Sequence, residues 1–313
     1  MRALGFDTSN YTTSVAAFDG VGGHNCSRLL DVRPGELGLR QSDALFAHVR
    51  RLPELSARLF DETARDAVCA VGASTRPRAV DGSYMPCFLA GQSQAKTLAK
   101  ALDVPFYAFS HQQGHIAAAL WSAGRMELLH APALAWHLSG GTTELLLVGS
   151  DGTDIRAEKI GGTSDISAGQ VIDRTGKLLS LQFPAGRALD ALAALSDCRE
   201  SFRVRLDGMS FSFSGLENKI VQFRASGASA EDTARYALLS VCRAVCGATR
   251  EALKRYPALP VIFSGGVASN SMLRARCGEF DAVFAAPEFS TDNALGIAVL
   301  TWLQENSDGT ADL

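Results

Sequence analysis

The stretch ALGFDTSNYTTSVAAFDG, residues 3–20, decides how the chain begins to fold. It opens with a short apolar run, continues with a cluster of Asp, Ser, Asn and Thr, and closes with a second apolar run that ends in Asp19-Gly20. Apolar runs bounded by turn-forming polar residues are typical of strands in a β-hairpin. The pattern therefore predicts two strands joined by a polar loop.

The same arrangement returns later in the chain, in ALAWHLSGGTTELLLV, residues 133–148. Two apolar runs, 133–138 and 144–148, flank the link SGGTT, and a third run covers 155–160. A repeated strand, loop and strand indicates a duplicated α/β fold. A chain of 313 residues also exceeds the ~250 residues at which single cores tend to divide. We expect a first lobe at 1–125, with the final segment 291–313 packing back on it, and a second lobe at 126–290.

The remaining apolar periodicity predicts the other elements of both lobes. Pro53 marks a break or a second start within the first long helix, and Ser110 is available to cap the helix that follows it. Further strands are expected at 67–73, 104–109, 261–264 and 282–285. Helices are expected at 42–60, 92–102, 110–121, 167–181, 187–195, 216–224, 230–255, 269–277 and 292–304.

Composition narrows the class of protein. Hydrophobic residues make up 47% and charged residues 20%, which fits a soluble globular chain. A net charge of -3 gives no global sign of a nucleic-acid binder, although it leaves room for a local basic patch. Seven cysteines without a CxxC pair predict reduced thiols and a cytoplasmic protein. Cys242 and Cys246 are expected to pack in the core, and no apolar run reaches the ~18 residues of a membrane span.

Glycine pairs follow several expected strands, at Gly140-Gly141, Gly161-Gly162 and Gly265-Gly266. Backbone amides at such turns can surround an anion, and a following helix amino terminus adds favourable partial charge. One pair alone is more often an ordinary turn. Three pairs in one chain, two of them in the form SGG, favour a nucleotide or phosphate pocket.

Two histidines, His111 and His115, stand four residues apart in the alanine-rich stretch SHQQGHIAAAL. That spacing places both imidazoles on one face of a helix, where they can share a metal ion. The alternative is that both are interior packing groups or part of a solvated edge. A third ligand must come from elsewhere, and the candidate is Asp292, whose alternative role is that of a helix cap.

At this point six motifs in order identify a resemblance. Together they are similar to the catalytic subunit of the tRNA threonylcarbamoyladenosine synthase, the TsaD or Gcp type, which is related to the M22 peptidases. The likeness runs from residue 1 to about 300 and implies the two-lobed fold of actin, Hsp70 chaperones and sugar kinases (ASKHA). The motifs are HQQGH (111–115), SGGTTE (139–144), GGTSDISAGQVIDRTGKLL (161–179), FSFSGLENKI (211–220), SGGVASNSMLR (264–274) and STDNALGIA (290–298).

The resemblance implies a set of site residues. His111, His115 and Asp292 would hold one catalytic divalent metal ion, iron or zinc. The substrate would be threonylcarbamoyl-AMP, made by a separate adenylate-forming enzyme, and the group would pass to N6 of the adenosine beside a tRNA anticodon, with release of AMP. Other synthase subunits would be partners. The residues that would contact the adenylate are Ser139, Gly140, Gly141, Asp173, Gly186, Asp190 and Asn270.

The chain departs from the family pattern at residues 7–13, 76–88 and 163–170 and at Thr142, where the family usually has histidine. These departures keep other acceptors open. One alternative is a carbamoyltransferase that uses an adenylate and a small-molecule acceptor, and another is a non-catalytic scaffold. A sugar-kinase-like phosphotransferase is disfavoured because hard Mg²⁺ seldom uses histidine. A protease is unsupported, since the chain has no HExxH and no GxSxG.

Overall fold

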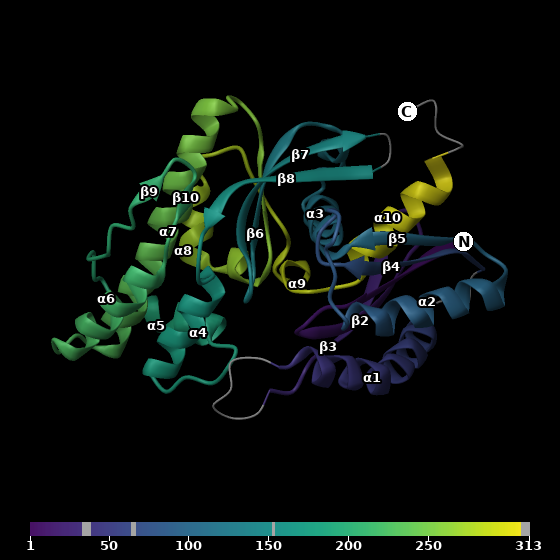
Figure 1. Cartoon of the computed structure of the whole chain (residues 1–313), viewed down its shortest axis with the longest axis horizontal. Helices are drawn as coiled ribbons and strands as arrows, with labels where there is room; N and C mark the ends of the chain where they lie inside the picture. Colours follow the sequence, from purple (N-terminus) through teal and green to yellow (C-terminus); the bar gives the residue numbers. More distant parts are fainter. Residues whose placement is uncertain (33–38, 64–66, 152–153, 308–313) are drawn as a thin grey trace. The chain divides into compact units, whose positions relative to one another are not determined.

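The computed structural model describes residues 1–32, 39–63, 67–151 and 154–307 (Figure 1). By compactness the chain forms two units. The first comprises Met1–Ala131, Gly149–Ala157 and Asp292–Leu313, and the second comprises Pro132–Val148 and Glu158–Thr291. The lobe boundaries expected from the sequence stay a prediction, because compactness alone does not define a folding domain. Residues 308–313 of the expected last segment lie outside the described residues.

The first unit is built on a five-stranded sheet in the order β3-β2-β1-β4-β5. β1 pairs antiparallel with β2, which confirms the predicted hairpin, while β4 pairs parallel with both β1 and β5. The edge strand β3 was not predicted, because its sequence GHNCSRL carries few apolar side chains. The strands are β1 (Arg2–Thr8), β2 (Thr12–Phe18), β3 (Gly23–Leu29), β4 (Val68–Arg76) and β5 (Phe106–Ser110).

Helices cover both faces of this sheet, which is why every residue of β1 and β2 is buried. α1 and α2 pack on one face, and α3 and α10 lie on the other (Figure 1). The predicted break at Pro53 is wrong: α1 runs through it without interruption. Pro53 is exposed, so water can satisfy the carbonyl that the proline leaves unbonded. The helices are α1 (Gln41–Glu62), α2 (Phe88–Leu102), α3 (His111–Ser122), the 3-10 helix η1 (Met126–His130) and α10 (Leu295–Asn306).

Two glycines let α3 and α10 approach closely. A Cβ atom on Gly296 would lie 1.8 Å from the carbonyl oxygen of Gly114, and one on Gly114 would lie 2.9 Å from Cδ1 of Ile297. Beneath them, a Cβ on Gly5 of β1 would lie 2.5 Å from the backbone of both Ala294 and Ala298. These close contacts hold the start of α3 and the segment before α10 at fixed positions.

We expect Gly296→Ala to destabilise the protein by ~3 kcal/mol, at the upper end for overpacking, because its neighbour is backbone that cannot rotate away. Urea unfolding followed by circular dichroism measures the loss. Gly149→Ala is the matched control, since a Cβ there meets nothing within 4 Å. Equal stability of the two variants would contradict the proposed role of the close helix contact.

The second sheet repeats the first. Its order is β12-β11-β6-β7-β8-β10-β9, in which β6 pairs antiparallel with β7, and β11 pairs parallel with both β6 and β12. The run β8-β7-β6-β11-β12 thus matches β3-β2-β1-β4-β5, and the predicted duplication is confirmed. The strands are β6 (Ala133–Leu138), β7 (Thr143–Asp151), β8 (Asp154–Thr163), β9 (Leu206–Asp207), β10 (Ser210–Phe211), β11 (Val261–Ser264) and β12 (Ala282–Phe284).

The core of the second unit lies between this sheet and the long helix α7. Trp136 of β6 is fully buried, and its indole donates to the Thr249 hydroxyl of α7 at 2.8 Å. Cys242 and Cys246 are buried in the same core, as predicted. In the described part of the chain no helix is both long enough and apolar enough to cross a bilayer. The helices are α4 (Ala168–Leu178), α5 (Gly186–Ala193), α6 (Ser214–Ala225), α7 (Ala230–Arg255), η2 (Gly266–Ser269), α8 (Ser271–Cys277) and α9 (Pro287–Ser290).

Candidate active site

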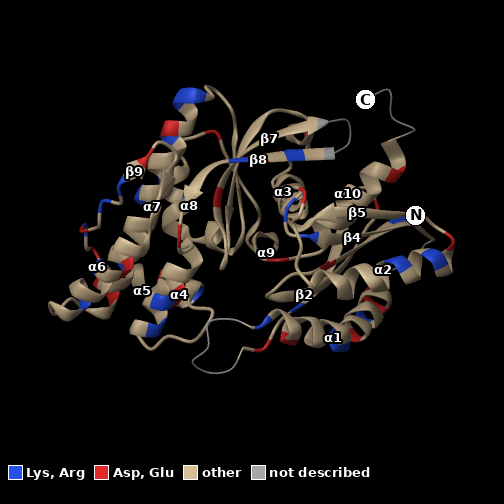
Figure 2. Cartoon of the chain, in the orientation of Figure 1, with Lys and Arg blue, Asp and Glu red and all other residues tan. Residues whose placement is uncertain are grey.

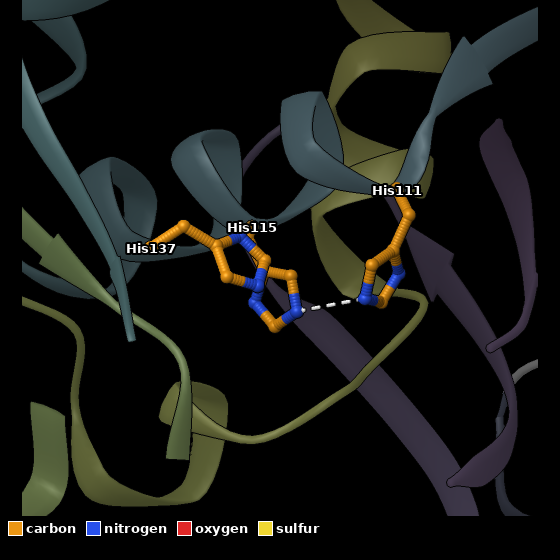
Figure 3. Close-up of side chains that lie close together, drawn as sticks. All are labelled: His111, His115 and His137. Carbon is orange, nitrogen blue, oxygen red and sulfur yellow. Dashed lines mark hydrogen bonds between the residues drawn. The ribbon is translucent and has the colours of Figure 1, made fainter. Parts of the chain in front are cut away.

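The two predicted histidines lie on the first two turns of α3. The Ser110 side chain accepts a hydrogen bond from the backbone of Gln113, whose side chain accepts one from the Ser110 backbone, so the predicted cap is confirmed. This capping box fixes the start of α3 at His111. Nε2 of His111 then lies 3.1 Å from Nε2 of His115, and the two rings, on one side of the helix, stand nearly at right angles to each other (Figure 3).

Asp292 approaches the same two nitrogens from the segment before α10. Its Oδ1 lies 3.2 Å from Nε2 of His115 and 3.6 Å from Nε2 of His111, while its Oδ2 accepts a hydrogen bond from the Ser9 hydroxyl. The alternative capping role is not observed, since α10 begins at Leu295 without a side-chain cap. The structure therefore brings the three predicted metal ligands together inside the first unit.

The spacing of these three atoms suits one metal ion. Ligands at about 2.1 Å from a divalent ion, separated by 90 to 109°, lie roughly 3.0 to 3.4 Å from one another. The observed separations of 3.1, 3.2 and 3.6 Å fall close to that range. Two imidazoles and one carboxylate are a donor set for Zn²⁺ or Fe²⁺, and three protein ligands leave coordination positions for a substrate.

Asp7 orients the first histidine and was missed as a functional residue. Its Oδ2 lies 2.6 Å from Nδ1 of His111, and its Oδ1 accepts a hydrogen bond of 2.7 Å from the Ser74 hydroxyl. A carboxylate on one ring nitrogen keeps the proton there and turns the other nitrogen toward a metal. A partial signal existed, because Asp7 lies near the end of the first strand, in the segment that departs from the family pattern.

The carboxylates also set the charge of the site. Burial lowers the pKa of His111, but Asp7 and Asp292 outweigh burial and raise this pKa to about 10. Burial likewise raises the pKa of Asp292, yet hydrogen bonds and charge from His111 and His115 hold it well below its ordinary value. A metal ion that bound Nε2 of His111 would therefore have to displace a proton from that imidazole.

We expect Asp7→Asn to weaken metal binding by roughly 10- to 100-fold, because the amide cannot hold the His111 tautomer in the same way. Titration of Zn²⁺ against a competing chelator measures the dissociation constant. Asp19→Asn serves as control, since Asp19 only accepts backbone hydrogen bonds in the β2–β3 turn. An unchanged Zn²⁺ affinity in Asp7→Asn would remove Asp7 from the site.

The predicted adenylate residues all lie in the second unit, where Ser139, Gly140 and Gly141 form the turn between β6 and β7. The Ser139 amide donates to the Thr142 carbonyl at 2.9 Å, and the Thr142 amide donates to the Ser139 hydroxyl at 3.1 Å. A Cβ on Gly169 of α4 would lie 2.4 Å from the Ser139 carbonyl oxygen, so the start of α4 packs directly against the turn. The turn is therefore rigid and held beside a helix amino terminus.

The second SGG turn lies beside the first. Gly265, which follows β11, has φ of +90°, and a Cβ there would lie 2.3 Å from the Leu138 carbonyl oxygen at the end of β6. Because β6 and β11 are parallel, both turns occupy the carboxyl edge of one sheet. Ligands of α/β folds bind at such edges.

Asp173 and Gly186 are also brought together. The Ala185 amide, next to Gly186, donates to Oδ1 of Asp173 at 2.9 Å. Burial raises the pKa of Asp173, only partly opposed by that hydrogen bond. A half-buried carboxylate with one oxygen bonded to the backbone is suited to accept a hydroxyl on the other oxygen.

Asp190 and Asn270 form a third group. The Asn270 amide donates to Oδ1 of Asp190 at 2.8 Å, and Ser271 donates to the same carboxylate through its backbone and its hydroxyl, each at 2.9 Å. The Asn270 side-chain oxygen caps α8. Three donors already occupy Asp190, so its observed role is to position Asn270 at the start of α8, and its predicted contact with the ribose stays a prediction.

Solved structures define the fold class. The chain resembles the activator of the 2-hydroxyisocaproyl-CoA dehydratase from Clostridium difficile with a TM-score of 0.56 at 14% identity, over 100% of this chain and 98% of that one. It resembles HypF from T. kodakarensis with a TM-score of 0.59 at 16% identity, over 98% of this chain and 48% of that one. The fold is the two-lobed ASKHA type, as predicted.

Sequence comparison gives the family. A model of the tRNA N6-adenosine threonylcarbamoyltransferase family, TsaD, matches residues 38–299. The curated relative from Carboxydothermus hydrogenoformans is 33% identical over 80% of this chain and 76% of its own length, and that from Streptococcus gordonii is 30% identical over 98% and 94%. The chain belongs to the TsaD family, and its enzyme class is acyl transfer.

Proposed function

We propose that the protein transfers a threonylcarbamoyl group from threonylcarbamoyl-AMP to N6 of the adenosine next to a tRNA anticodon and releases AMP. In the reaction the N–C bond to adenosine forms as the bond from the carbonyl carbon to the phosphate oxygen breaks, AMP departs with the electron pair of that bond, and N6 gives up one proton to the solvent. The relatives named tRNA N6-adenosine threonylcarbamoyltransferase support the modification and its acceptor. The adenylate donor, the metal and the release of AMP are our proposals.

The observation that carries this proposal is the convergence of His111, His115 and Asp292 within 3.6 Å. These residues would hold one Fe²⁺ or Zn²⁺ ion, which when bound supplies Lewis-acid polarisation of a carbonyl group. The role of Asp7 and Ser9 is to hold the ligands in position, through His111 and Asp292 respectively. A scaffold protein has no evident use for a buried ligand set with such supports.

The second unit would hold the adenylate. The SGG turn at Ser139 to Gly141 and the start of α4 offer backbone amides to the phosphate. Asp173 would accept a ribose hydroxyl beside Gly186, and Asp190 would hold Asn270 toward the nucleotide. A phosphate held by amides leaves as a stabilised anion, which favours departure of AMP.

Other components follow from the same proposal. Threonylcarbamoyl-AMP requires a separate adenylate-forming enzyme, and we propose that further synthase subunits assemble with this chain. We also propose a cytoplasmic location, in keeping with seven cysteines of which none forms a disulfide in the described part of the chain.

The test is a reaction of the purified protein with threonylcarbamoyl-AMP and unmodified tRNA, with and without the partner subunits of a related synthase. Mass spectrometry of digested nucleosides is expected to detect threonylcarbamoyladenosine. If adenylate is bound and metal is present but tRNA stays unmodified in every mixture, the acceptor is wrong. A small molecule would then be the preferred hypothesis for the acceptor.

A further inference from the structure

An arginine-rich groove lies in the second unit, and none of the site residues predicted from the sequence lines it. It has a volume of about 1160 Å³ and is formed by α7, α8 and the segment that leads into β9. In Figure 2, blue Lys and Arg positions recur along the segment beside β9 and on α7. All five arginines are exposed, and they are Arg203, Arg205, Arg243, Arg250 and Arg276.

The groove is electropositive in a chain that is otherwise acidic. Its five arginines face two glutamates, Glu251 and Glu279, whereas the whole chain carries a net charge of -3. Both glutamates are already paired, Glu279 with Arg250 at 2.5 Å and Glu251 with Lys254 at 2.7 Å. The carboxylates therefore leave most of the arginine charge uncompensated.

Three of the arginines are available to a ligand. Among the described residues, the side chains of Arg203, Arg205 and Arg276 take part in no hydrogen bond or ion pair. Guanidinium groups gathered around a hollow repel one another, and an anionic ligand relieves that repulsion. Arginine also matches phosphate oxygens with paired N–H donors, which a lysine cannot do.

The hollow itself is created by small residues. Ala244, Gly247 and Ala275 line it, so no large side chain fills the space between the two helices and the β9 segment. A Cβ on Gly247 would lie 2.9 Å from Cδ1 of Leu206, which shows that the β9 segment packs closely on α7. This close contact holds the arginines before β9 at the rim of the groove.

We propose that this groove binds the phosphodiester backbone of the RNA substrate, an inference that rests on tRNA being the acceptor. α8 joins the groove to the proposed adenylate residues: Asn270 caps its first turn and Arg276 stands on its last. Six residues of helix span roughly 9 Å, far less than the size of a tRNA. An RNA held by the groove thus also reaches the part of the second unit where the adenylate is proposed to bind.

The test compares two triple variants of the full chain with the same loss of charge. The groove variant carries Arg203→Gln, Arg205→Gln and Arg276→Gln. The control variant carries Lys219→Gln, Arg224→Gln and Arg255→Gln, which are exposed cations of the same unit outside the groove. Fluorescence anisotropy measures the dissociation constant of unmodified tRNA over a range of salt concentrations, and thermal melting verifies that both variants fold.

We expect the groove variant to bind tRNA at least ~10-fold more weakly, with a salt dependence reduced by about one unit of slope for each phosphate group that the protein no longer neutralises. The control variant should stay within about twofold of the unchanged protein. Equal tRNA affinities and slopes in the two variants would overturn the proposal. Binding of inorganic tripolyphosphate that is lost in the groove variant, with tRNA binding unaffected, would make the groove a small-anion site and overturn it equally.

The binding test of the groove and the test of the proposed transfer reaction can fail separately. If the unchanged protein binds tRNA through the groove but forms no threonylcarbamoyladenosine, the proposed reaction fails and the groove stands. If the groove variant modifies tRNA with an unaltered KM for tRNA, the groove fails and the reaction stands.

Discussion

His111→Ala is expected to lose bound metal and to lower threonylcarbamoyl transfer by at least about 10³-fold, the several kcal/mol that a Lewis acid supplies. Removal of one imidazole leaves two protein ligands, too few for a stable divalent site. The variant should still fold, since His111 occupies the first position of α3 and the capping box that starts the helix belongs to Ser110 and Gln113. Metal content by plasma mass spectrometry is the direct measurement.

His130→Ala provides the matched control, because His130 is an exposed histidine of the same unit at the end of η1. It should retain both metal and activity. Metal content that stays the same in His111→Ala and His130→Ala would sink the assignment of the metal site. Lost activity with retained metal would instead point to an effect on substrate binding.

Much of the fold follows from local pattern. The strand, polar loop and strand at residues 3–20 and again at 133–148 predicted the repeated hairpins, and α7 begins and ends as the periodicity of its 26 residues indicates. The pattern fails where few apolar side chains mark an element, as in β3, or where a strand is two residues long, as in β9 and β10. Pro53 was misread because its exposure is a tertiary property.

The candidate site, too, could be predicted only in part from the sequence. The HxxxH spacing predicted that His111 and His115 share a helix face, since helix geometry alone dictates it. Spacing could not indicate Asp292, which lies 177 positions after His115. It was a candidate because it is a carboxylate at the expected start of the last helix, and the resemblance then supported that choice. Asp7 and Ser9 were not found because their roles depend on how β1 and the approach to α10 pack on α3. Close glycine contacts such as Gly114 with Gly296 create that arrangement.

The arginine groove could not be predicted from the sequence, for a related reason. Its five arginines come from the segment before β9, from α7 and from α8. More than 70 positions of sequence separate the first of them, Arg203, from the last, Arg276. The net charge is a sum over the whole chain, so a negative value does not reveal a local cluster of arginines. Tertiary packing gathers these residues at one place: α8 packs on α7, and Leu206 packs on Gly247 of α7.

The adenylate proposal makes a sharp prediction at Asp173. We expect Asp173→Ala to weaken binding of AMP and of threonylcarbamoyl-AMP by ~1 to 3 kcal/mol, or about 5- to 150-fold, because a ribose hydroxyl loses a charged acceptor. Isothermal titration calorimetry measures both affinities. Asp197→Ala, at an exposed position of the same unit, should bind both nucleotides as the unchanged protein does.

The pH dependence separates this role from a general loss of structure. Burial raises the pKa of Asp173 above its ordinary 3.8, so as the pH falls its carboxylate takes up a proton at a higher pH than an exposed aspartate does. The ionised form is the acceptor, and the affinity advantage over Asp173→Ala is therefore expected to shrink as the solution is acidified. Comparing the two proteins at each pH cancels the titration of the AMP phosphate. An affinity ratio that stays constant from neutral to acidic pH would mean that the carboxylate does not contact the ribose, and Asp173 would then serve only to hold Ala185 at the start of α5.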